Sequence, residues 1–239
     1  MKHAKIVIVA LVSMMSVGMT SCDKDDNSSG NEGNHGGGGT PTIEWVDLGL
    51  PSGRLWAKCN LGATTPENYG NYYAWGETTT KEVYLWSTYK YSKGDYNQLT
   101  KYCSSSDYGY NFFTDTLTTL QAVDDAAMAT LGSDARIPTK KDWQELIDNT
   151  TSEWTSSNGV NGWEFTAANG NTLFLPAAGF RVGSGVNDAS SEGNYWSASL
   201  HKDYPGGAWR IGFNSNNLGL GSESRDSGLS VRAVRASQK

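Results

Sequence analysis

Histidine side chains are the first groups through which this chain could catalyse a reaction. Of the three histidines, His3 and His35 lie in N-terminal segments that the composition places outside a folded domain. A Ser-His-Asp or Cys-His mechanism would therefore have to use His201. His201 lies in the polar loop sequence 200–207, where a solvated histidine is the common case. Zinc sites built from His and Cys also lack ligands in this chain.

Two pairs of carboxylates could act on a glycosidic bond, because that chemistry needs only two such groups at a suitable separation. Asp124 and Asp125 precede one helical pattern, and Glu145 and Asp148 lie on the polar face of another. Negative charge is favoured at helix N-termini and polar helix faces are normally solvated, so both pairs have a structural explanation. We expect no catalytic residue and no enzyme, with a glycan hydrolase as the third-ranked function.

Calcium ligands are the remaining site chemistry to consider. Asn187, Asp188 and Glu192 could supply oxygen ligands, but residues 183–193 equally fit a polar loop, which is the interpretation we favour. The sequence therefore predicts neither a metal nor a cofactor.

Cys22 has the best-defined chemical context of the cysteines. Residues 1–21 combine a basic start, an apolar stretch too short to span a bilayer, and small Thr20 and Ser21, as in a secretory leader. Met19-Thr20-Ser21-Cys22 resembles a bacterial lipobox, so we predict that residues 1–21 are a signal peptide and that Cys22 is acylated. Each buried CH₂ of an acyl chain contributes about 0.8 kcal/mol, so several chains would anchor the protein to a membrane. A secreted protein with a chance cysteine is the alternative.

Residues 22–42 are predicted to be a lipidated, flexible tether. They are rich in Gly, Asn, Ser and Asp and contain no residue that could build a core. Lys24, Asp25 and Asp26 resemble the acidic export tag of Bacteroidota lipoproteins, which predicts an outer membrane lipoprotein exposed on the cell surface. The formal charge of −6 argues against a nucleic-acid partner.

Cys59 and Cys103 are the only cysteines expected inside the folded domain, which we place at residues 43–239. An exported protein meets conditions that allow a disulfide between them, and such a crosslink would stabilise by roughly 4 kcal/mol. Cys59 alternatively serves as a small apolar core residue on the inward face of its strand. The sequence leaves both possibilities open.

Alternating apolar residues predict a first hairpin near the start of the domain. Residues 46–50 and 55–61 flank a turn at 51–53, and Leu55 and Leu61 should share its buried face.

Two short helices and a sheet-rich end follow. Residues 124–131 indicate a helix that stops at Gly132, and Thr139 should cap a second helix with Asp142 three residues later. The second helix has an apolar stripe of Trp143, Leu146 and Ile147. Asn169-Gly170 predicts a tight turn between strands at 163–167 and 172–176, and residues 194–236 contain only strands and polar turns. The pattern predicts an α+β fold.

The same segments resemble the Fibrobacter succinogenes major paralogous domain family. The resemblance runs from about residue 45 to 235 in ordered blocks at 46–53, 55–57, 59–63, 74–77, 99–102, 136–139, 175–179, 195–197 and 230–232. It implies a C-type-lectin-like domain, related to formylglycine-generating enzymes and to binding proteins diversified by retroelements. The oxidase chemistry of the former uses a late cysteine pair, and no cysteine follows Cys103. Ala233, where many members have proline, matters little at a strand end.

Nine tryptophans and twelve tyrosines could form the core or grip a ligand. Trp56, Trp75, Trp143 and Trp196 lie in patterned blocks and are predicted to be core residues. Trp209 is either a core residue or a contact residue at a strand end, because Ile211 and Phe213 share its strand face.

In the diversified relatives the last strands and turns form the binding face, and residues 199–229 are the corresponding stretch here. The residues predicted to bind ligand are Ser199, His201, Asp203, Tyr204, Trp209, Arg210, Asn214, Asn216, Asn217, Glu223, Asp226 and Ser227. Asp115-Thr116-Leu117 also resembles a short acceptor for O-glycosylation at Thr116, with a strand or turn edge as the alternative.

Taken together, these features predict a ligand-binding or adhesion module for a glycan or protein. A structural component of a surface assembly, such as a fimbrial tip or scaffold lipoprotein, is the alternative.

Overall fold

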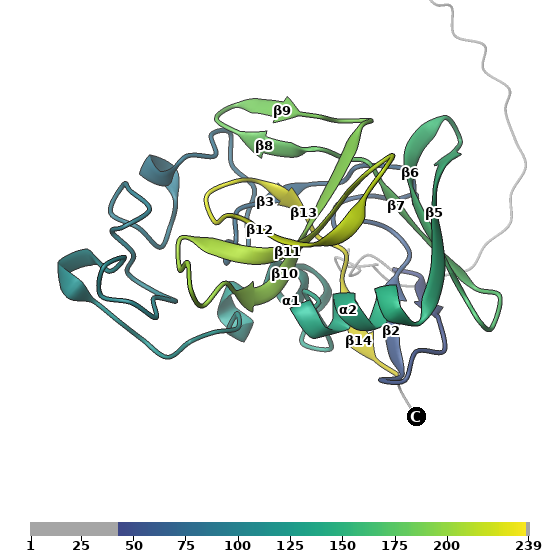
Figure 1. Cartoon of the computed structure of the whole chain (residues 1–239), viewed down its shortest axis with the longest axis horizontal. Helices are drawn as coiled ribbons and strands as arrows, with labels where there is room; N and C mark the ends of the chain where they lie inside the picture. The colour runs from purple at the N-terminus through teal and green to yellow at the C-terminus, as the bar shows by residue number, and fades with distance from the viewer. Residues whose placement is uncertain (1–42, 238–239) are drawn as a thin grey trace, which may run out of the picture. The chain divides into compact units, whose positions relative to one another are not determined.

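Residues 43–237 are described by a computed structural model as a mixed α and β structure made mostly of short strands (Figure 1). The predicted signal peptide, the tether and Cys22 lie outside the described residues. Across 43–237, none of the helices combines the length and the apolar character needed to cross a membrane.

The first and last strands of the domain belong to one four-stranded sheet. Its order is β1 (Trp45–Asp47), β2 (Arg54–Ala57), β14 (Val234–Ala236) and β4 (Ala135–Arg136). The predicted hairpin forms, with Val46 opposite Trp56. The prediction of one buried face is correct only in part: Leu61 is buried as predicted, but Leu55 is half-buried, and Trp56 from the other face is fully buried. Strand β2 ends at Ala57, so Cys59 and Leu61 follow the strand instead of continuing its alternation.

The central sheet has five strands, four from the second half of the chain and one from an early segment. Its order is β12 (Leu218–Ser224), β11 (Gly207–Asn214), β10 (Glu192–Leu200), β13 (Leu229–Ser230) and β3 (Tyr72–Tyr73). The register between β10 and β11 shifts after Trp196, where the irregularity ends the regular pairing. This end of β10 carries Ser199 and leads into the loop with His201.

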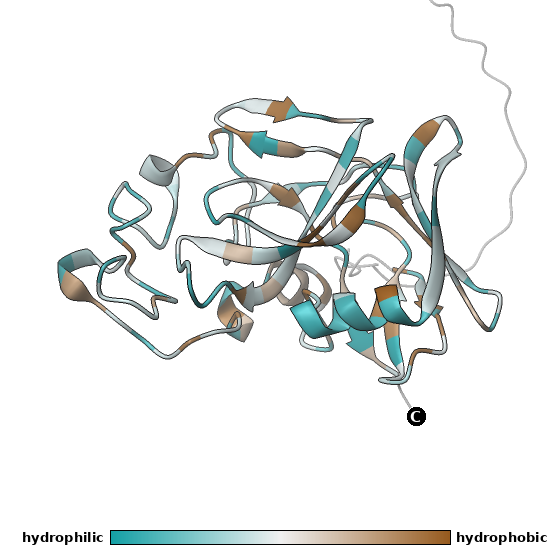
Figure 2. Ribbon diagram, viewed as in Figure 1, coloured by the Kyte–Doolittle hydropathy of each residue, from teal (hydrophilic) through white to brown (hydrophobic). Residues whose placement is uncertain are grey.

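Two helices form where the capping signals predict them. Asp125 caps α1 (Ala126–Leu131) by accepting from two backbone amides, and Gly132 ends it with a positive φ of 96°. Thr139 and Asp142 form a capping box at the start of α2 (Lys140–Asp148). Helix α2 packs against the central sheet through buried Trp143 and Leu146, while most of the helix is hydrophilic (Figure 2).

Two further sheets lie between α2 and β10 in the sequence. The first is β5 (Thr150–Ser157), β6 (Val160–Ala167) and β7 (Thr172–Pro176), with the predicted turn at Asn169-Gly170 and with β5 unanticipated. The second pairs β8 (Phe180–Val182) with β9 (Gly185–Asn187). Residues 183–193 are therefore not simply the polar loop that we predicted, since they contain β9.

The hydrophobic core has two clusters built around tryptophans. Trp56, Trp75, Trp143 and Trp196 are all fully buried, as predicted. Trp56 and Trp143 join β2 to α2, with ring centroids 4.7 Å apart. Each buried aromatic side chain removes a large apolar area from water, which is the main stabilising contribution to the fold.

The segment between β3 and α1 has little regular structure and is held by buried polar groups. It contains three short 3₁₀ turns: η1 (Trp86–Thr88), η2 (Tyr110–Phe112) and η3 (Ala122–Asp124). It extends to the left of the central sheet in Figure 1. Asp124 is buried within it and accepts hydrogen bonds from Tyr91, from Tyr102 at 2.6 Å and from Lys101 at 2.6 Å. These bonds satisfy a carboxylate that would otherwise be costly to bury.

Candidate functional site

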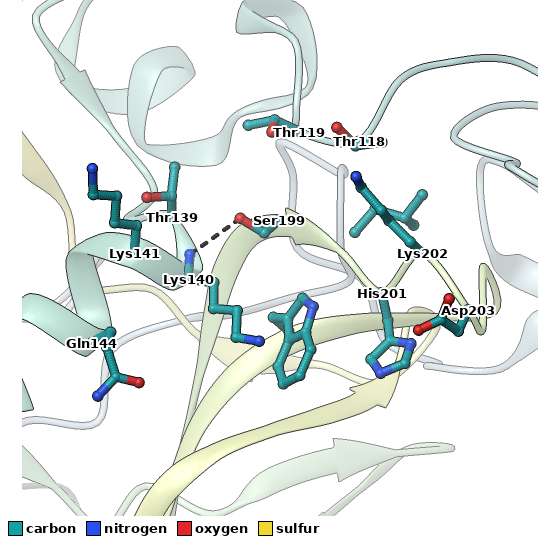
Figure 3. A pocket seen from close by; sticks show the side chains of 12 residues that line it. Thr118, Thr119, Thr139, Lys140, Lys141, Gln144, Ser199, His201, Lys202 and Asp203 are labelled. Atoms are coloured by element: carbon teal, nitrogen blue, oxygen red, sulfur yellow. Dashed lines mark hydrogen bonds between the residues drawn. The ribbon is translucent and has the colours of Figure 1, made fainter.

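A cavity of about 640 Å³ lies where the start of α2 meets the end of β10 (Figure 3). We call it the α2 pocket. Its lining residues are Thr118, Thr119, Thr139, Lys140, Lys141, Gln144, Ser199, Leu200, His201, Lys202, Asp203 and Trp209. Four of the predicted ligand-binding residues, Ser199, His201, Asp203 and Trp209, are therefore brought together here.

Trp209 is a half-buried wall of this pocket. The amino nitrogen of Lys140 lies 3.2 Å from the centroid of the indole ring, and the ring of His201 lies 4.9 Å from it at an interplanar angle of 30°. A cation over a tryptophan face contributes about 0.5 to 2 kcal/mol. The sequence left open whether Trp209 is a core residue or a contact residue at a strand end. The structure places it near the start of β11, half-buried, with Lys140 and His201 beside its ring.

Ser199 links strand β10 to the first turn of α2. The backbone amide of Lys140 donates to the Ser199 hydroxyl oxygen at 3.1 Å, and the amide of Ser199 donates to the hydroxyl oxygen of Ser197 at 3.1 Å. Figure 3 shows Lys140 and Lys141 on one side of Ser199 and Lys202 on the other. Because the Ser199 hydroxyl accepts from Lys140, its own proton can be donated to a ligand.

The loop after β10 is braced by its own backbone. The amide of His201 donates to the Gly207 carbonyl at 3.2 Å, and the amide of Gly207 donates to the Tyr204 carbonyl at 2.8 Å. Ser104 also donates to the carbonyl of Lys202 at 2.8 Å. Nδ1 of His201 is buried and has no hydrogen-bond partner within residues 43–237. The pocket wall is thus fixed by backbone bonds, while the imidazole keeps unused hydrogen-bonding capacity.

The remaining predicted residues of β11 and β12 lie on the opposite face of the sheet. Neighbouring side chains of a strand point to opposite faces, so Arg210 points away from the face of Trp209. Arg210 lies 3.6 Å from Glu223 and lines a shallow hollow of about 190 Å³ together with Glu192, Asn194, Gly212, Phe213, Asn214 and Asn217. Asn214 accepts from the amides of Asn216 and Asn217, which gives these asparagines a role in the turn. The single binding face predicted from sequence is split into two.

Asp226 and Ser227 are corrections to the predicted set. Both are buried, with 7% and 3% of their surface exposed, so they are not placed to contact a ligand. Asp226 accepts from the Ser224 hydroxyl, and burial raises the pKa of its carboxyl. Tyr204 remains exposed, and its ring packs edge-on against that of Tyr108.

The candidate catalytic carboxylates have structural partners. Burial pushes the pKa of Asp124 upward, but its hydrogen bonds from Lys101, Tyr102 and Tyr91 outweigh burial and leave the pKa lowered. Burial raises the pKa of Asp125, the cap of α1. Glu145 accepts from Ser52, and Asp148 accepts from Gln144. No group of three His, Cys, Asp or Glu side chains that could hold a metal is present between residues 43 and 237.

Cys59 and Cys103 are free thiols, so the disulfide left open by the sequence is not formed in this structure. Burial raises the pKa of both thiols.

Thr116, the predicted O-glycosylation residue, is exposed, and the neighbouring Asp115 carboxylate accepts from the amides of Tyr102 and Cys103.

Lys140, Lys141 and Gln144 are pocket residues that the sequence analysis missed. One signal could have revealed the two lysines, since positive charges in the first turn of a helix oppose the preference of that end for negative charge. Such a local violation often marks a functional site.

No family model, curated protein or solved structure matches this chain. The family resemblance therefore rests on the sequence blocks alone.

Proposed function

We propose that this protein is a lipid-anchored module on the bacterial surface that binds a glycan or protein ligand through the α2 pocket. The observation that carries the proposal is the pocket itself. Its volume of about 640 Å³ falls within the range of small-molecule sites, roughly 300 to 1,000 Å³. Its lining joins one large aromatic side chain to amino, hydroxyl and amide groups that can orient a ligand.

We also propose a C-type-lectin-like fold for the domain. Two helices precede a sheet-rich half, and the blocks that carry the family resemblance contain residues that hold the fold. Trp56, Trp75 and Trp196 from these blocks are fully buried. Arg232 from the last block is also fully buried and donates to the side-chain oxygen of Asn60 at 3.0 and 2.8 Å. The resemblance thus concerns residues that determine structure, which supports a shared fold more than a shared ligand.

The pocket is tested by filling it. Gln144 is exposed on α2 and lines the pocket, so Gln144→Trp in the full chain should block the cavity without disturbing the core. Ser156→Trp, at an exposed position of β5 outside the pocket, is the matched control. Both variants and the parent are compared on a glycan array and in a pull-down from cell-surface extracts. Ligand binding should be lost only in Gln144→Trp, and equal binding by both variants would contradict the proposal.

The anchor is tested separately. Cys22→Ala should release the protein from the membrane fraction, whereas replacement of Lys24, Asp25 and Asp26 by Ala should leave it anchored but protected from external protease. Membrane retention of Cys22→Ala would contradict lipidation at this residue.

A structural role in a surface assembly is the second candidate, because strand β12 is an edge strand of the central sheet. β12 pairs only with β11 among the strands of residues 43–237. Its residues include no Lys and no Pro, and Glu223 is its one charged residue, so the edge has few of the features that block pairing. Another strand could add to this edge through main-chain hydrogen bonds. Proline at Leu220 should reduce recovery of partner proteins in the pull-down if this second role is correct, and unchanged recovery would exclude it.

A further inference from the structure

We infer that the α2 pocket binds an acidic saccharide, that is, a short sugar chain bearing carboxylate or sulfate groups. This inference rests on the proposed binding function and specifies the class of ligand. Three observations carry it: the unpaired lysines of the pocket, their position on α2, and the neutral groups between them.

The pocket concentrates positive charge, because its three lysines form no ion pair with a carboxylate among residues 43–237. Residues 43–237 contain eight lysines, and four of them, Lys58, Lys81, Lys90 and Lys101, form ion pairs. Three of the other four line this one pocket: Lys140, Lys141 and Lys202. Asp203 is the one acidic residue of the lining. This local excess stands against a formal charge of −6 for the whole chain, so an anion is attracted to this pocket in preference to the rest of the surface.

Lys140 and Lys141 occupy a position on α2 where positive charge is normally avoided. Both lie in the first turn of α2, where the helix dipole is positive and cations are disfavoured. The nearby Asp142 carboxylate does not compensate them, because it pairs with Arg54 at 2.7 Å and Arg136 at 2.8 Å. A bound anion would be stabilised by the amino groups and by the positive end of the helix dipole, although the amides of Lys140 and Asp142 already donate to Ser199 and Thr139.

The size and neutral lining of the pocket indicate a saccharide as the carrier of the anion. An inorganic anion would leave most of a 640 Å³ cavity empty. Thr118, Thr119, Ser199 and Gln144 offer hydroxyl and amide groups that can hydrogen-bond to sugar hydroxyls. Trp209 adds an apolar wall, as pockets that bury a ring require.

The test measures binding of defined probes to the full chain by calorimetry. The probes are trigalacturonic acid, neutral galactotriose, a sulfated galactose oligosaccharide and hexaglutamate. We expect trigalacturonic acid or the sulfated sugar to bind at least tenfold more tightly than galactotriose, and the one preferred identifies the anion. Affinity should fall between about 50 mM and about 500 mM NaCl, because added salt screens exposed charges.

Lysine variants locate the effect. Lys141 and Lys202 are exposed, so Lys141→Gln with Lys202→Gln should leave the melting temperature unchanged. Loss of exposed charge pairs weakens binding by about two- to fivefold each, so the double variant should lose roughly tenfold. Lys93→Gln, at an exposed lysine outside the pocket, should bind like the parent.

The outcomes separate this inference from the proposed function. Equal binding of galactotriose and the acidic sugars, insensitive to the lysines, would overturn the inference and leave a neutral-sugar pocket. Preference for hexaglutamate would overturn it in favour of an acidic peptide. If no probe binds but a cell-surface ligand is lost in Gln144→Trp, the inference fails and the proposed function stands. If neither occurs, both fail.

Discussion

Replacing Arg225 should destabilise the domain more than any change at the candidate site. Its side chain is fully buried and has no carboxylate partner among residues 43–237. The guanidinium donates to the Tyr89 hydroxyl at 2.9 Å and to the carbonyls of Tyr102 at 3.1 Å, Pro205 at 3.0 Å and Lys101 at 3.0 Å. It also lies against the rings of Trp75, Tyr89 and Tyr102.

The magnitude follows from what Arg225→Ala leaves behind. Four oxygens lose their donor, and each buried unsatisfied group costs about 1 to 3 kcal/mol. The loss is offset by several kcal/mol, because the guanidinium is no longer desolvated. The free energy of unfolding should therefore fall by about 3 to 5 kcal/mol, a large part of a total of roughly 5 to 15 kcal/mol. Arg225→Lys should lose less, because an ammonium can still reach some of these oxygens.

The assay is urea unfolding of the full chain, followed by tryptophan fluorescence and by near-UV circular dichroism so that two-state behaviour is checked. Arg210→Ala is the matched control, since that arginine is half-exposed and its one ion pair is long at 3.6 Å. The control should stay within about 1 kcal/mol of the parent. If Arg225→Ala also stays within that range, the buried guanidinium does not hold these segments together.

Three further predictions concern other parts of the fold. The pKa of Asp124 is lowered in the folded state, so its contribution to stability is present above the ordinary carboxyl pKa of about 3.9 and is lost as pH falls through the folded value. In urea melts, Asp124→Asn should therefore lose less stability than the parent on acidification. An unchanged pH profile would contradict this prediction. A Cβ on Gly193 would overlap the ring of Phe213, whereas Gly219 has nothing within 4 Å; Gly193→Ala should cost about 1 to 3 kcal/mol and Gly219→Ala much less, with equal melting temperatures as the contrary result. Alkylation in urea without reductant should label both Cys59 and Cys103, because they are free thiols; protection of both would show a disulfide.

Elements with local signals were predictable from the sequence. The cap at Thr139, the stop at Gly132 and the Asn169-Gly170 turn depend on residues within a few positions, and the structure confirms them. The first helix begins at Ala126, with Asp125 as its cap, instead of at Asp124 as predicted. The single buried face predicted for β2 was correct only in part, because the alternation was counted through residue 61 although the strand ends at Ala57, and because Trp56 on the other face is buried too.

The irregular segment between β3 and α1 could not be predicted, because its order depends on distant partners. Arg225 binds carbonyls of this segment from more than one hundred residues away. Polar residues beside such a group become buried with it, which is why Asp226 and Ser227 were mistaken for surface residues. Sequence polarity alone does not distinguish a solvated turn from a buried polar network.

About half of the residues that line the α2 pocket come from residues 199–229, the stretch that the sequence marked. The others come from parts of the chain that the sequence did not connect to this stretch. Ser199 and Trp209 lie in the stretch that the sequence marked, but Lys140 comes from α2, 59 residues before Ser199, and the hydrogen bond between them is a tertiary contact. The opposite wall depends on Arg225, which donates to the Pro205 carbonyl and so ties the end of the loop carrying His201 to the core. The pocket is thus placed between a capped helix and a loop fixed by a buried cation. Because the helix and the loop are already held in place, a ligand can bind to the amino groups without the entropy cost of ordering the loop.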